Sequence, residues 1–187
     1  MLSDLLDSAD DERKKECLLS ALFMFRCSQD PDIESFLQNR AIEFLNRGLC
    51  SVYLILDEEL FMQGKISIEA YFTLSHKTLC VQDGMSKSKI KEIDGFKTVT
   101  SLHFVLIGQL GKYILEKEDG TYIRSSITSK EILDYAFEVI YASSALIPCK
   151  CVLVECSDEE KVRKAYEDYQ FKFLQNDGKH NQYYKVL

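Results

Sequence analysis

Two apolar strands, each followed by a helix, fill residues 102–171 and constrain the fold more than any other part of the chain. The first strand, 102–111, is apolar almost throughout, which is typical of a strand buried on both faces of a sheet. The second strand, 151–156, reads Cys-Val-Leu-Val-Glu-Cys. This order of elements predicts an α/β fold (an α+β mixed sheet) with one central sheet flanked by helices.

Capping boxes predict where the two helices begin. In the sequence Thr128-Ser129-Lys130-Glu131, the threonine caps the helix and Glu131 reaches back to it. The sequence Ser157-Asp158-Glu159-Glu160 predicts the same arrangement for the last helix. The buried side of the first helix is expected to consist of Ile132, Leu133, Ala136, Phe137 and Ile140.

The front half of the chain predicts more helix than strand. Residues 1–24 are expected to form an N-terminal helical extension capped by Ser8, with Asp10, Asp11 and Glu12 in the first turn, although residues 21–25 also suit the start of a strand. Asp30-Pro31 is a helix start, with an N-cap aspartate and proline at the first helical position, and Gly48 is its stop.

Strands and polar segments alternate over the rest of the chain. Strands are predicted at 51–56, at 66–74, and near 172–174 and 183–186, with Asp57-Glu58-Glu59 as a turn. Residues 81–100 are polar and rich in lysine, and they predict a mobile insertion, either a solvated loop or a substrate lid. Residues 112–127 are predicted to form a loop with a turn at 116–120.

Composition limits the class of protein. With 187 residues and 46% hydrophobic content, the chain is expected to form a single domain over residues 1–187. A net charge of −7 disfavours non-specific binding to nucleic acid and suits a cationic substrate such as an amine.

Location and metal content are also predicted from the sequence. No apolar run approaches the roughly 18 residues of a membrane span, and the acidic start is unlike a signal peptide, so we expect a cytoplasmic protein. The seven cysteines suit reduced thiols rather than a disulfide framework. Neither they nor the three histidines have the spacing of metal ligands, so no metal is expected.

Two features carry candidate chemistry. A helix N-terminus can hold a phosphate, and this one is preceded by a guanidinium and four hydroxyls in Arg124-Ser125-Ser126-Ile127-Thr128-Ser129, although the hydroxyls also suit simple capping. Tyr166 lies nine residues past the predicted cap of the last helix. Its phenol is either a proton donor to a leaving thiolate or an aromatic core residue with a satisfied hydroxyl.

This arrangement resembles the acyl-CoA half of the GNAT acetyltransferases. Ile107-Gly108-Gln109-Leu110-Gly111 looks like the Leu-Gly-Arg-Leu-Ala strand of one GNAT branch, and Ala165-Tyr166 through Phe171 looks like the Tyr-x-x-x-Gly-Phe ending. The Asp30-Pro31 helix and Ala70-Tyr71-Phe72-Thr73-Leu74-Ser75 resemble the first half of the same branch. The resemblance runs from about Phe25 to the end of the chain.

The resemblance implies an N-acetyltransferase that uses acetyl-CoA, with Tyr166 as the acid that protonates the CoA thiolate. It implies that CoA is bound by two segments, Gln109, Leu110, Gly111 and Lys112 on the strand and Arg124, Ser125, Ser126, Ile127, Thr128 and Ser129 in the loop. Glu155 is the first candidate for the base, with Glu69, His103 or an ordered water as alternatives. An acetyl-cysteine route through Cys156 is a further alternative.

The loop departs from the family pattern. Ser125, Ile127 and Ser129 stand where the glycines of the phosphate cradle would fall, the loop between Gly111 and Arg124 is longer than usual, and Gln170 replaces the glycine before Phe171. A second hypothesis is therefore a non-catalytic GNAT-like binding or regulatory module. A third is a toxin-like GNAT that acetylates charged tRNA, the one nucleic acid partner considered. The chain is expected to be a monomer or a homodimer, and the acceptor amine is not specified by any motif.

Overall fold

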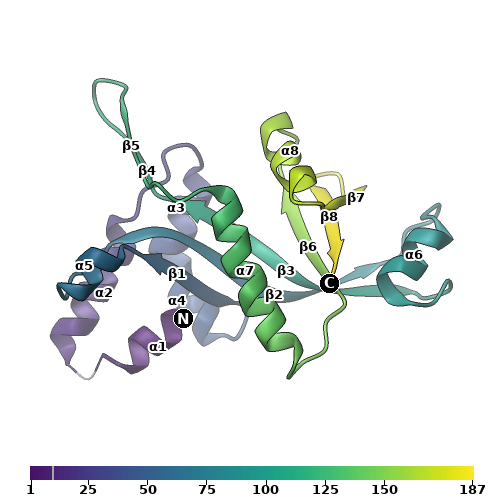
Figure 1. Ribbon diagram of the computed structural model, residues 1–187, viewed down its shortest axis with the longest axis horizontal. Coiled ribbons are helices and arrows are strands. Elements are labelled where there is room, and N and C mark those ends of the chain that lie inside the picture. The colour runs from purple at the N-terminus through teal and green to yellow at the C-terminus, as the bar shows by residue number, and fades with distance from the viewer. Residues whose placement is uncertain (10) are drawn as a thin grey trace. The chain divides into compact units, whose positions relative to one another are not determined.

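The computed structural model describes residues 1–9 and 11–187 and has a mixed sheet at its centre (Figure 1). The six strands of this sheet lie in the order β1-β2-β3-β6-β8-β7, and a separate hairpin contains β4 and β5. The predicted α/β class is confirmed. The strands are β1 (Ser51–Leu56), β2 (Ile68–Cys80), β3 (Ser101–Lys112), β4 (Ile114–Glu116), β5 (Tyr122–Arg124), β6 (Cys151–Cys156), β7 (Lys172–Asn176) and β8 (Asn181–Val186).

Helices precede, interrupt and follow the strands. The predicted crossover between β3 and β6 contains the longest of them, α7 (Ser129–Ser144), and its five predicted core residues are all buried. The others are α1 (Leu2–Asp7), α2 (Glu12–Met24), α3 (Pro31–Ser35), the π-helical turn η1 (Phe36–Arg40), α4 (Ala41–Asn46), α5 (Glu58–Met62), α6 (Lys87–Asp94) and α8 (Glu160–Asp168).

The chain divides into two compact units. The first consists of Met1–Thr73 and Gln109–Ile132, and the second of Leu74–Gly108 and Leu133–Leu187. Strands β2 and β3 and helix α7 each contribute residues to both units. The single domain expected for residues 1–187 stays a prediction.

Tyr71 is the centre of the core of the first unit. Its ring is fully buried, makes an edge contact with Phe25 at 5.4 Å between ring centroids, and stacks on Phe36 at 6.3 Å. Its hydroxyl donates a 2.6 Å hydrogen bond to the carbonyl of Ile33. Aromatic pairs of this kind contribute about 0.5–1.5 kcal/mol each beyond the area they bury. Tyr71 therefore joins strand β2 to the helical segment that Asp30-Pro31 starts.

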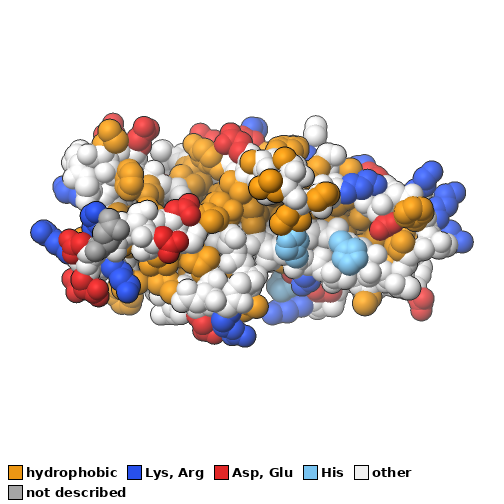
Figure 2. All heavy atoms as spheres, turned by 90° about the horizontal axis from the view of Figure 1, so that it is seen from below, with side chains coloured by type: hydrophobic (Ala, Val, Ile, Leu, Met, Phe, Trp, Pro, Cys, Tyr) orange, Lys and Arg blue, Asp and Glu red, His pale blue; other side chains and the backbone are white. Residues whose placement is uncertain are grey.

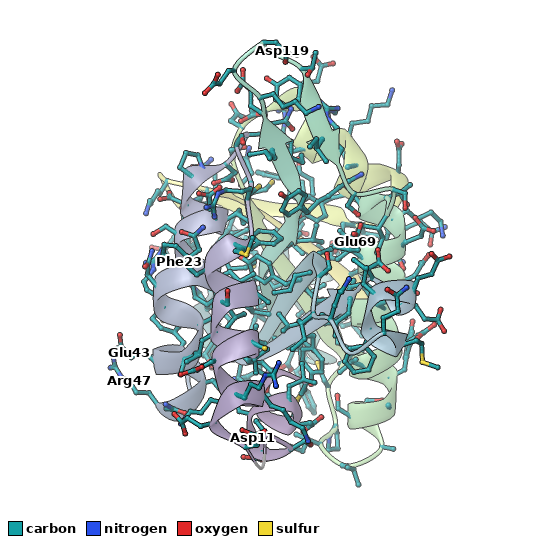
Figure 3. All side chains as sticks on the ribbon, turned by 90° about the vertical axis from the view of Figure 1, so that its left-hand side faces the viewer. Asp11, Phe23, Glu43, Arg47, Glu69 and Asp119 are labelled. Atoms are coloured by element: carbon teal, nitrogen blue, oxygen red, sulfur yellow. The ribbon has the colours of Figure 1, made fainter. Side chains whose placement is uncertain are left out.

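That helical segment is continuous but contains a π-helical turn. Asp30 caps it by accepting hydrogen bonds from the N–H groups of Asp32 and Ile33, as predicted. The Ala41 N–H then bonds to the carbonyl of Phe36, five residues back. This wider turn accommodates the buried Phe36 ring, over which the Arg40 guanidinium lies at 5.6 Å. Figure 3 shows the exposed ion pair of Glu43 and Arg47 at the end of the segment.

The second unit contains the parallel strand pair. Val105–Ile107 of β3 pair with Val152–Val154 of β6, and β6 pairs with β8 over its whole length in the antiparallel sense. The predicted strand 151–156 is confirmed residue for residue. β8 in turn pairs with β7, where the predicted Asn176-Asp177-Gly178 connection lies.

The lysine-rich segment 81–100 contains helix α6, which follows the end of β2 (Figure 1). Ile90 and Ile93 of α6 are buried in a cluster with Leu102, Leu153 and Tyr184. The Lys89 ammonium donates hydrogen bonds to the carbonyls of β7 residues 173 and 174. This segment is thus packed on the sheet, and the mobility expected for it stays a prediction.

Three predicted local details are wrong. The cap of α2 is Asp11, which accepts the Arg13 N–H at 2.7 Å, whereas Ser8 ends α1; Asp10 lies outside the described residues. Asp57 caps helix α5 by accepting the Leu60 N–H, so the predicted turn is the first turn of a helix.

The third concerns α8, which begins only at Glu160, with Glu159 as its N-cap. Ser157 does not cap it, because the neighbouring Asp158 is held by Asn181 and Arg163, and the helix starts two residues later than predicted. The loop predicted at 112–127 contains the β4–β5 hairpin, with Asp119 at its tip (Figure 3).

The surface carries several hydrophobic side chains, visible as orange spheres on the face drawn in Figure 2. All seven cysteines are free thiols. Among residues 1–9 and 11–187, no helix is long and apolar enough to cross a membrane. Over the same residues, no group of three or more His, Cys, Asp or Glu side chains could hold a metal ion.

We predict that Tyr71→Phe lowers the free energy of unfolding by about 1 kcal/mol, because the partly buried carbonyl of Ile33 loses its hydroxyl donor. Urea denaturation followed by circular dichroism would measure this change. Tyr122→Phe on the exposed hairpin is the matched control and should change stability little. Equal effects of the two substitutions would contradict this account of the core.

Candidate active site

The predicted phosphate loop lies in the first unit and is ordered by its own serine. Arg124 is the last residue of β5, and its exposed guanidinium lies 4.8 Å from the ring centroid of Tyr122. The hydroxyl of Ser125, only 8% exposed, accepts the N–H of Ile127 at 3.2 Å. This hydroxyl therefore holds the loop in shape, and Ser126 and Thr128 are the exposed hydroxyl residues on either side of Ile127.

The capping box at the start of α7 is confirmed. The carboxylate of Glu131 accepts both the N–H and the hydroxyl of Thr128 at 2.7 Å, and the Glu131 N–H bonds to the Thr128 hydroxyl oxygen at 3.2 Å. These bonds place a negative charge at the positive end of the helix dipole. The capping carboxylate and a bound phosphate would thus compete for the same helix N-terminus.

The remaining groups of the loop can still hold an anion. In the described part of the chain, the backbone N–H groups of Ser126 and Ser129 have no hydrogen-bond acceptor. The Arg124 guanidinium and the Ser126 hydroxyl are exposed. This set of donors suits the phosphate oxygens of a pyrophosphate, whereas the Glu131 carboxylate opposes it.

The strand residues predicted to bind CoA differ in burial and in whether their polar groups already have a hydrogen-bond partner. The Gln109 N–H donates to the Thr73 hydroxyl at 2.9 Å, and the Gln109 side-chain oxygen is buried with no partner among the described residues. That oxygen fits an amide N–H of a pantetheine arm. Gly111 is buried, and a Cβ there would come within 2.6 Å of the Ile33 side chain and closer still to the Tyr71 ring. The packing of the core therefore requires a glycine at position 111. Its neighbours Leu110 and Lys112 are half-buried.

One candidate base lies in the same cavity as the loop. A cavity of about 740 Å³ in the first unit is lined by Arg124, residues 125–127, Glu69 and the acidic residues 57–59. Glu69 lies near the start of β2 and is labelled in Figure 3. The structure therefore brings Glu69 together with the predicted phosphate loop, which the sequence alone did not indicate.

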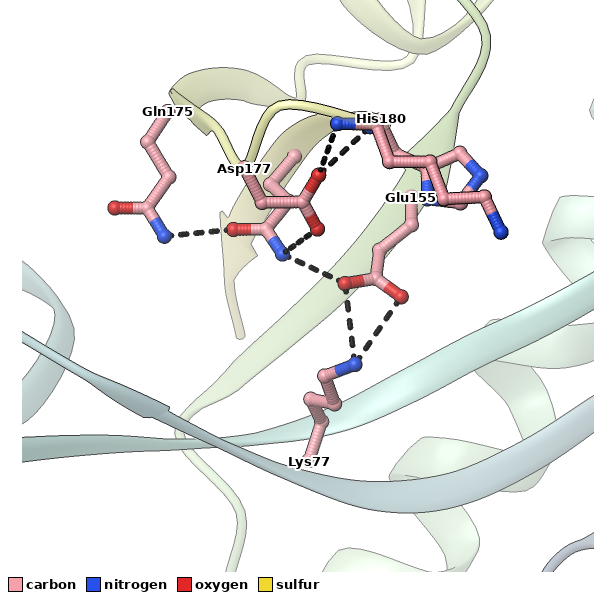
Figure 4. A network of polar contacts seen from close by, with 7 residues as sticks. Lys77, Glu155, Gln175, Asp177 and His180 are labelled. Atoms are coloured by element: carbon pink, nitrogen blue, oxygen red, sulfur yellow. Dashed lines mark hydrogen bonds and ion pairs between the residues drawn. The ribbon is translucent and has the colours of Figure 1, made fainter.

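Glu155, the first candidate base, lies in the second unit and is already engaged. Lys77 places its ammonium 3.3 and 3.4 Å from the two carboxylate oxygens, and the Gln182 side-chain amide donates to one of them at 2.6 Å (Figure 4). The same amide reaches the Asp177 carboxylate at 3.3 Å. Glu155 is 18% exposed, so its carboxylate is partly open to solvent.

Tyr166 on α8 is suited to hold a proton. Burial, and then the neighbouring Cys156, raise its pKa well above the ordinary value, so the phenol is protonated at neutral pH. Its ring packs edge-on against Phe171 at 5.6 Å. The described residues offer its hydroxyl no hydrogen-bond partner. Tyr169, one turn further on, differs because its hydroxyl donates to Asp134 at 2.6 Å.

The other candidates are less available. Both ring nitrogens of His103 are engaged, one by the Thr78 hydroxyl at 3.0 Å and the other by the Ser101 hydroxyl at 3.4 Å. Cys156 is buried, and burial raises the pKa of its thiol. Because nucleophilic attack needs the thiolate, the structure favours an inert thiol here over an acetyl-cysteine route.

Sequence reasoning missed three residues that contact the candidates. Thr73 bonds to Gln109, and its position as the one polar residue between Phe72 and Leu74 was an available signal. Lys77 and Gln182 contact Glu155, but they come from strands distant in sequence. Only the register of the sheet brings them together, and no local pattern predicts that register.

Comparison with known proteins places this fold. No protein-family model and no curated protein matches the chain in sequence. Among solved structures, AtaTR bound with acetyl-CoA and AtaT complexed with acetyl-methionyl-tRNAfMet each match with a TM-score of 0.64 and 18% identity, over 88% of this chain and 86% of theirs. A tyrosine-to-phenylalanine mutant of KacT matches with a TM-score of 0.64 and 17% identity, over 87% of this chain and 85% of its own. The chain thus has the fold of these proteins.

We predict that Glu131→Gln tightens binding of pyrophosphate, because glutamine keeps the capping geometry and removes the carboxylate that repels phosphate. The expected gain is about 1 kcal/mol or less, which corresponds to at most about fivefold in Kd. Isothermal titration calorimetry would measure it. Glu138→Gln, on an exposed position of the same helix, is the control, and unchanged or weaker binding by the first variant would contradict a phosphate site at this helix start.

Proposed function

We propose that the chain is an N-acetyltransferase that moves an acetyl group from acetyl-CoA to an amine. The observation that carries the proposal is its likeness, over 88% of the chain, to a structure with acetyl-CoA bound. The unpartnered oxygen of Gln109 and the open donors of Arg124, Ser126 and Ser129 support it. This chain therefore carries groups that can bind the pantetheine arm and the pyrophosphate of acetyl-CoA.

The residues divide the work as follows. Acetyl-CoA supplies the acetyl group as a thioester. Gln109–Lys112 bind the pantetheine arm, and the backbone N–H groups of Leu110 and Gly111 polarise the thioester carbonyl. Arg124 and the hydroxyl residues of the loop hold the pyrophosphate. The amine attacks directly, with Glu155 as the proposed base.

Tyr166 is the proposed acid. Its phenol is protonated at neutral pH because burial raises its pKa, and its hydroxyl is not committed to a carboxylate as that of Tyr169 is. It can therefore give its proton to a departing thiolate. The acceptor is proposed as a cationic or amine-bearing molecule, in keeping with the net charge of −7.

A second candidate acceptor is an aminoacyl-tRNA. The likeness to AtaT complexed with acetyl-methionyl-tRNAfMet favours it. The net charge of −7 opposes a large RNA footprint, because phosphate contacts need lysine and arginine. Binding of charged tRNA that weakens steeply with salt would select this candidate, whereas acetylation of small amines without tRNA binding would select the first.

We predict that acetyl-CoA raises the thermal stability of the protein, with CoA effective as well and ATP without effect. A ligand at about 100 times its Kd adds about 2.7 kcal/mol of stability, which gives a clear shift in Tm. Differential scanning fluorimetry would measure it. No shift at millimolar acetyl-CoA would favour a non-catalytic module with this fold instead.

We predict that Tyr166→Phe lowers kcat by about a hundredfold or more while the Kd for acetyl-CoA changes little, since general acid catalysis contributes about 10²–10⁴-fold. Thiol release in the presence of an amine acceptor would follow the reaction. Tyr169→Phe is the matched control on the same helix end and should leave kcat nearly unchanged. Unchanged turnover of Tyr166→Phe, with chemistry rate-limiting, would exclude Tyr166 as the acid.

A further inference from the structure

Glu155 occupies the point at which β6 continues without β3. The parallel pairing of β3 with β6 covers Val105–Ile107 and Val152–Val154, and Glu155 is the next residue of β6. From there on, β6 keeps its pairing with β8, in which Glu155 is opposite Gln182. A group bound to the Glu155 carboxylate therefore lies at the end of the β3–β6 pairing.

That group is the side chain of Lys77. Its ammonium lies 3.3 and 3.4 Å from the two oxygens of Glu155, close to symmetric between them (Figure 4). The Lys77 side chain is 38% exposed, so the amine is not sealed in the core. Glu155 is also fixed from the other side by the Gln182 amide, itself only 1% exposed. An amine and a proton acceptor are thus held together by the fold.

We propose that Lys77 is a site of self-acetylation, with acetyl-CoA as the donor and Glu155 as the proton acceptor that frees its amine. This inference rests on the proposed function, because it uses the same donor. In this proposal Lys77 and Glu155 take part in a reaction, whereas an ion pair alone would be only a structural contact. Ion pairs that are partly open to solvent contribute little to stability.

The reaction balances without a further reactant. The Lys77 ammonium passes one proton to the Glu155 carboxylate, and its nitrogen lone pair forms a bond to the thioester carbonyl carbon. The carbon–sulfur bond breaks, and the thiolate takes a proton from Tyr166. The amide nitrogen loses its second proton to water or buffer. The products are an acetylated Lys77, CoA as its thiol, and one proton released to solution once Glu155 and Tyr166 return to their starting states.

Other lysines of the second unit lack this combination. Lys172 is ion-paired with Glu92, but it lies at the start of β7, at an edge of the sheet. Lys185 pairs with Val152 near the start of β6, and its ammonium lies over the rings of Phe137 and Tyr169. Its nitrogen donates to the Tyr169 carbonyl, which cannot take a proton.

Acetylation would also change the site. It removes the positive charge of Lys77, so Glu155 loses its ion pair and keeps only the hydrogen bond from Gln182. The carboxylate is then available to accept a proton from an external amine. Self-acetylation would therefore convert Glu155 from an occupied to an open base.

Mass spectrometry tests the proposal. The purified protein is mapped first, then incubated with acetyl-CoA, and acetyl incorporation is followed by intact mass and by peptide mapping. We expect one acetyl group, at Lys77, added much faster than at exposed lysines such as Lys87. Glu155→Gln should slow this step by about a hundredfold, as loss of a general base does.

Conservative substitutions distinguish acetylation at Lys77 from chemical acetylation of exposed lysines. Lys77→Arg keeps a positive charge beside Glu155 and should abolish the modification, whereas Lys172→Arg should leave its rate unchanged. Thermal unfolding verifies that each variant is folded. Modification of Lys77 no faster than that of Lys87, or at the same rate in urea-unfolded protein, overturns the proposal, because it then reflects chemical acetylation alone.

The same samples distinguish a failure of the self-acetylation proposal from a failure of the proposed function. If thiol is released with an external amine while Lys77 stays unmodified, self-acetylation is overturned and the proposed function stands. If acetyl-CoA neither shifts Tm nor releases thiol, both fail together. Acetylation confined to Lys77, lost in Lys77→Arg, supports both.

Discussion

The contact between Tyr71 and Gly111 determines much of the first unit. Because residue 111 has no side chain, the Tyr71 ring and Ile33 can approach the β3 backbone. The same ring then stacks on Phe36 and contacts Phe25. Because residue 111 is a glycine, the Tyr71 ring of β2 can contact both the β3 backbone and the helical segment that contains Ile33 and Phe36. Residues 109–112, to which the CoA arm is assigned, are positioned by this packing, so their geometry is a property of the core as much as of the ligand.

A second constraint acts at the start of α7, where fold stability and ligand binding compete for the same groups. Glu131 closes a capping box with Thr128, and Ser125 takes the Ile127 N–H. Each bond stabilises the apo fold, and each uses a donor that a glycine-rich loop would leave for phosphate. Internal hydrogen bonds therefore use N–H groups that the glycines of a phosphate-binding loop would leave free. Arg124 and Ser126 remain as the groups that compensate.

The sequence predicted elements well where local chemistry decides them. The apolar run 151–156 and the Asp30-Pro31 helix start appear as expected, and the Thr128 box forms between residues only three positions apart. The similar box at Ser157 fails because Asp158 is held by Asn181 of β8. The candidate site follows the same rule. The Lys77–Glu155 pair depends on the register of three strands, which local patterns do not encode.

The two acid–base candidates of the second unit are opposite in their surroundings, and this opposition has a chemical consequence. Tyr166 packs against the Phe171 ring, its hydroxyl has no partner in the described part of the chain, and burial keeps it protonated. Glu155 contacts the Lys77 ammonium and the Gln182 side-chain amide. One candidate is thus a protonated phenol, and the other is a carboxylate held beside an amine. Direct acyl transfer to an amine requires an acid for the leaving group and an acceptor for the proton of the amine. Because the charge of Glu155 is balanced by Lys77, the first amine on which that base can act is the one the fold already supplies.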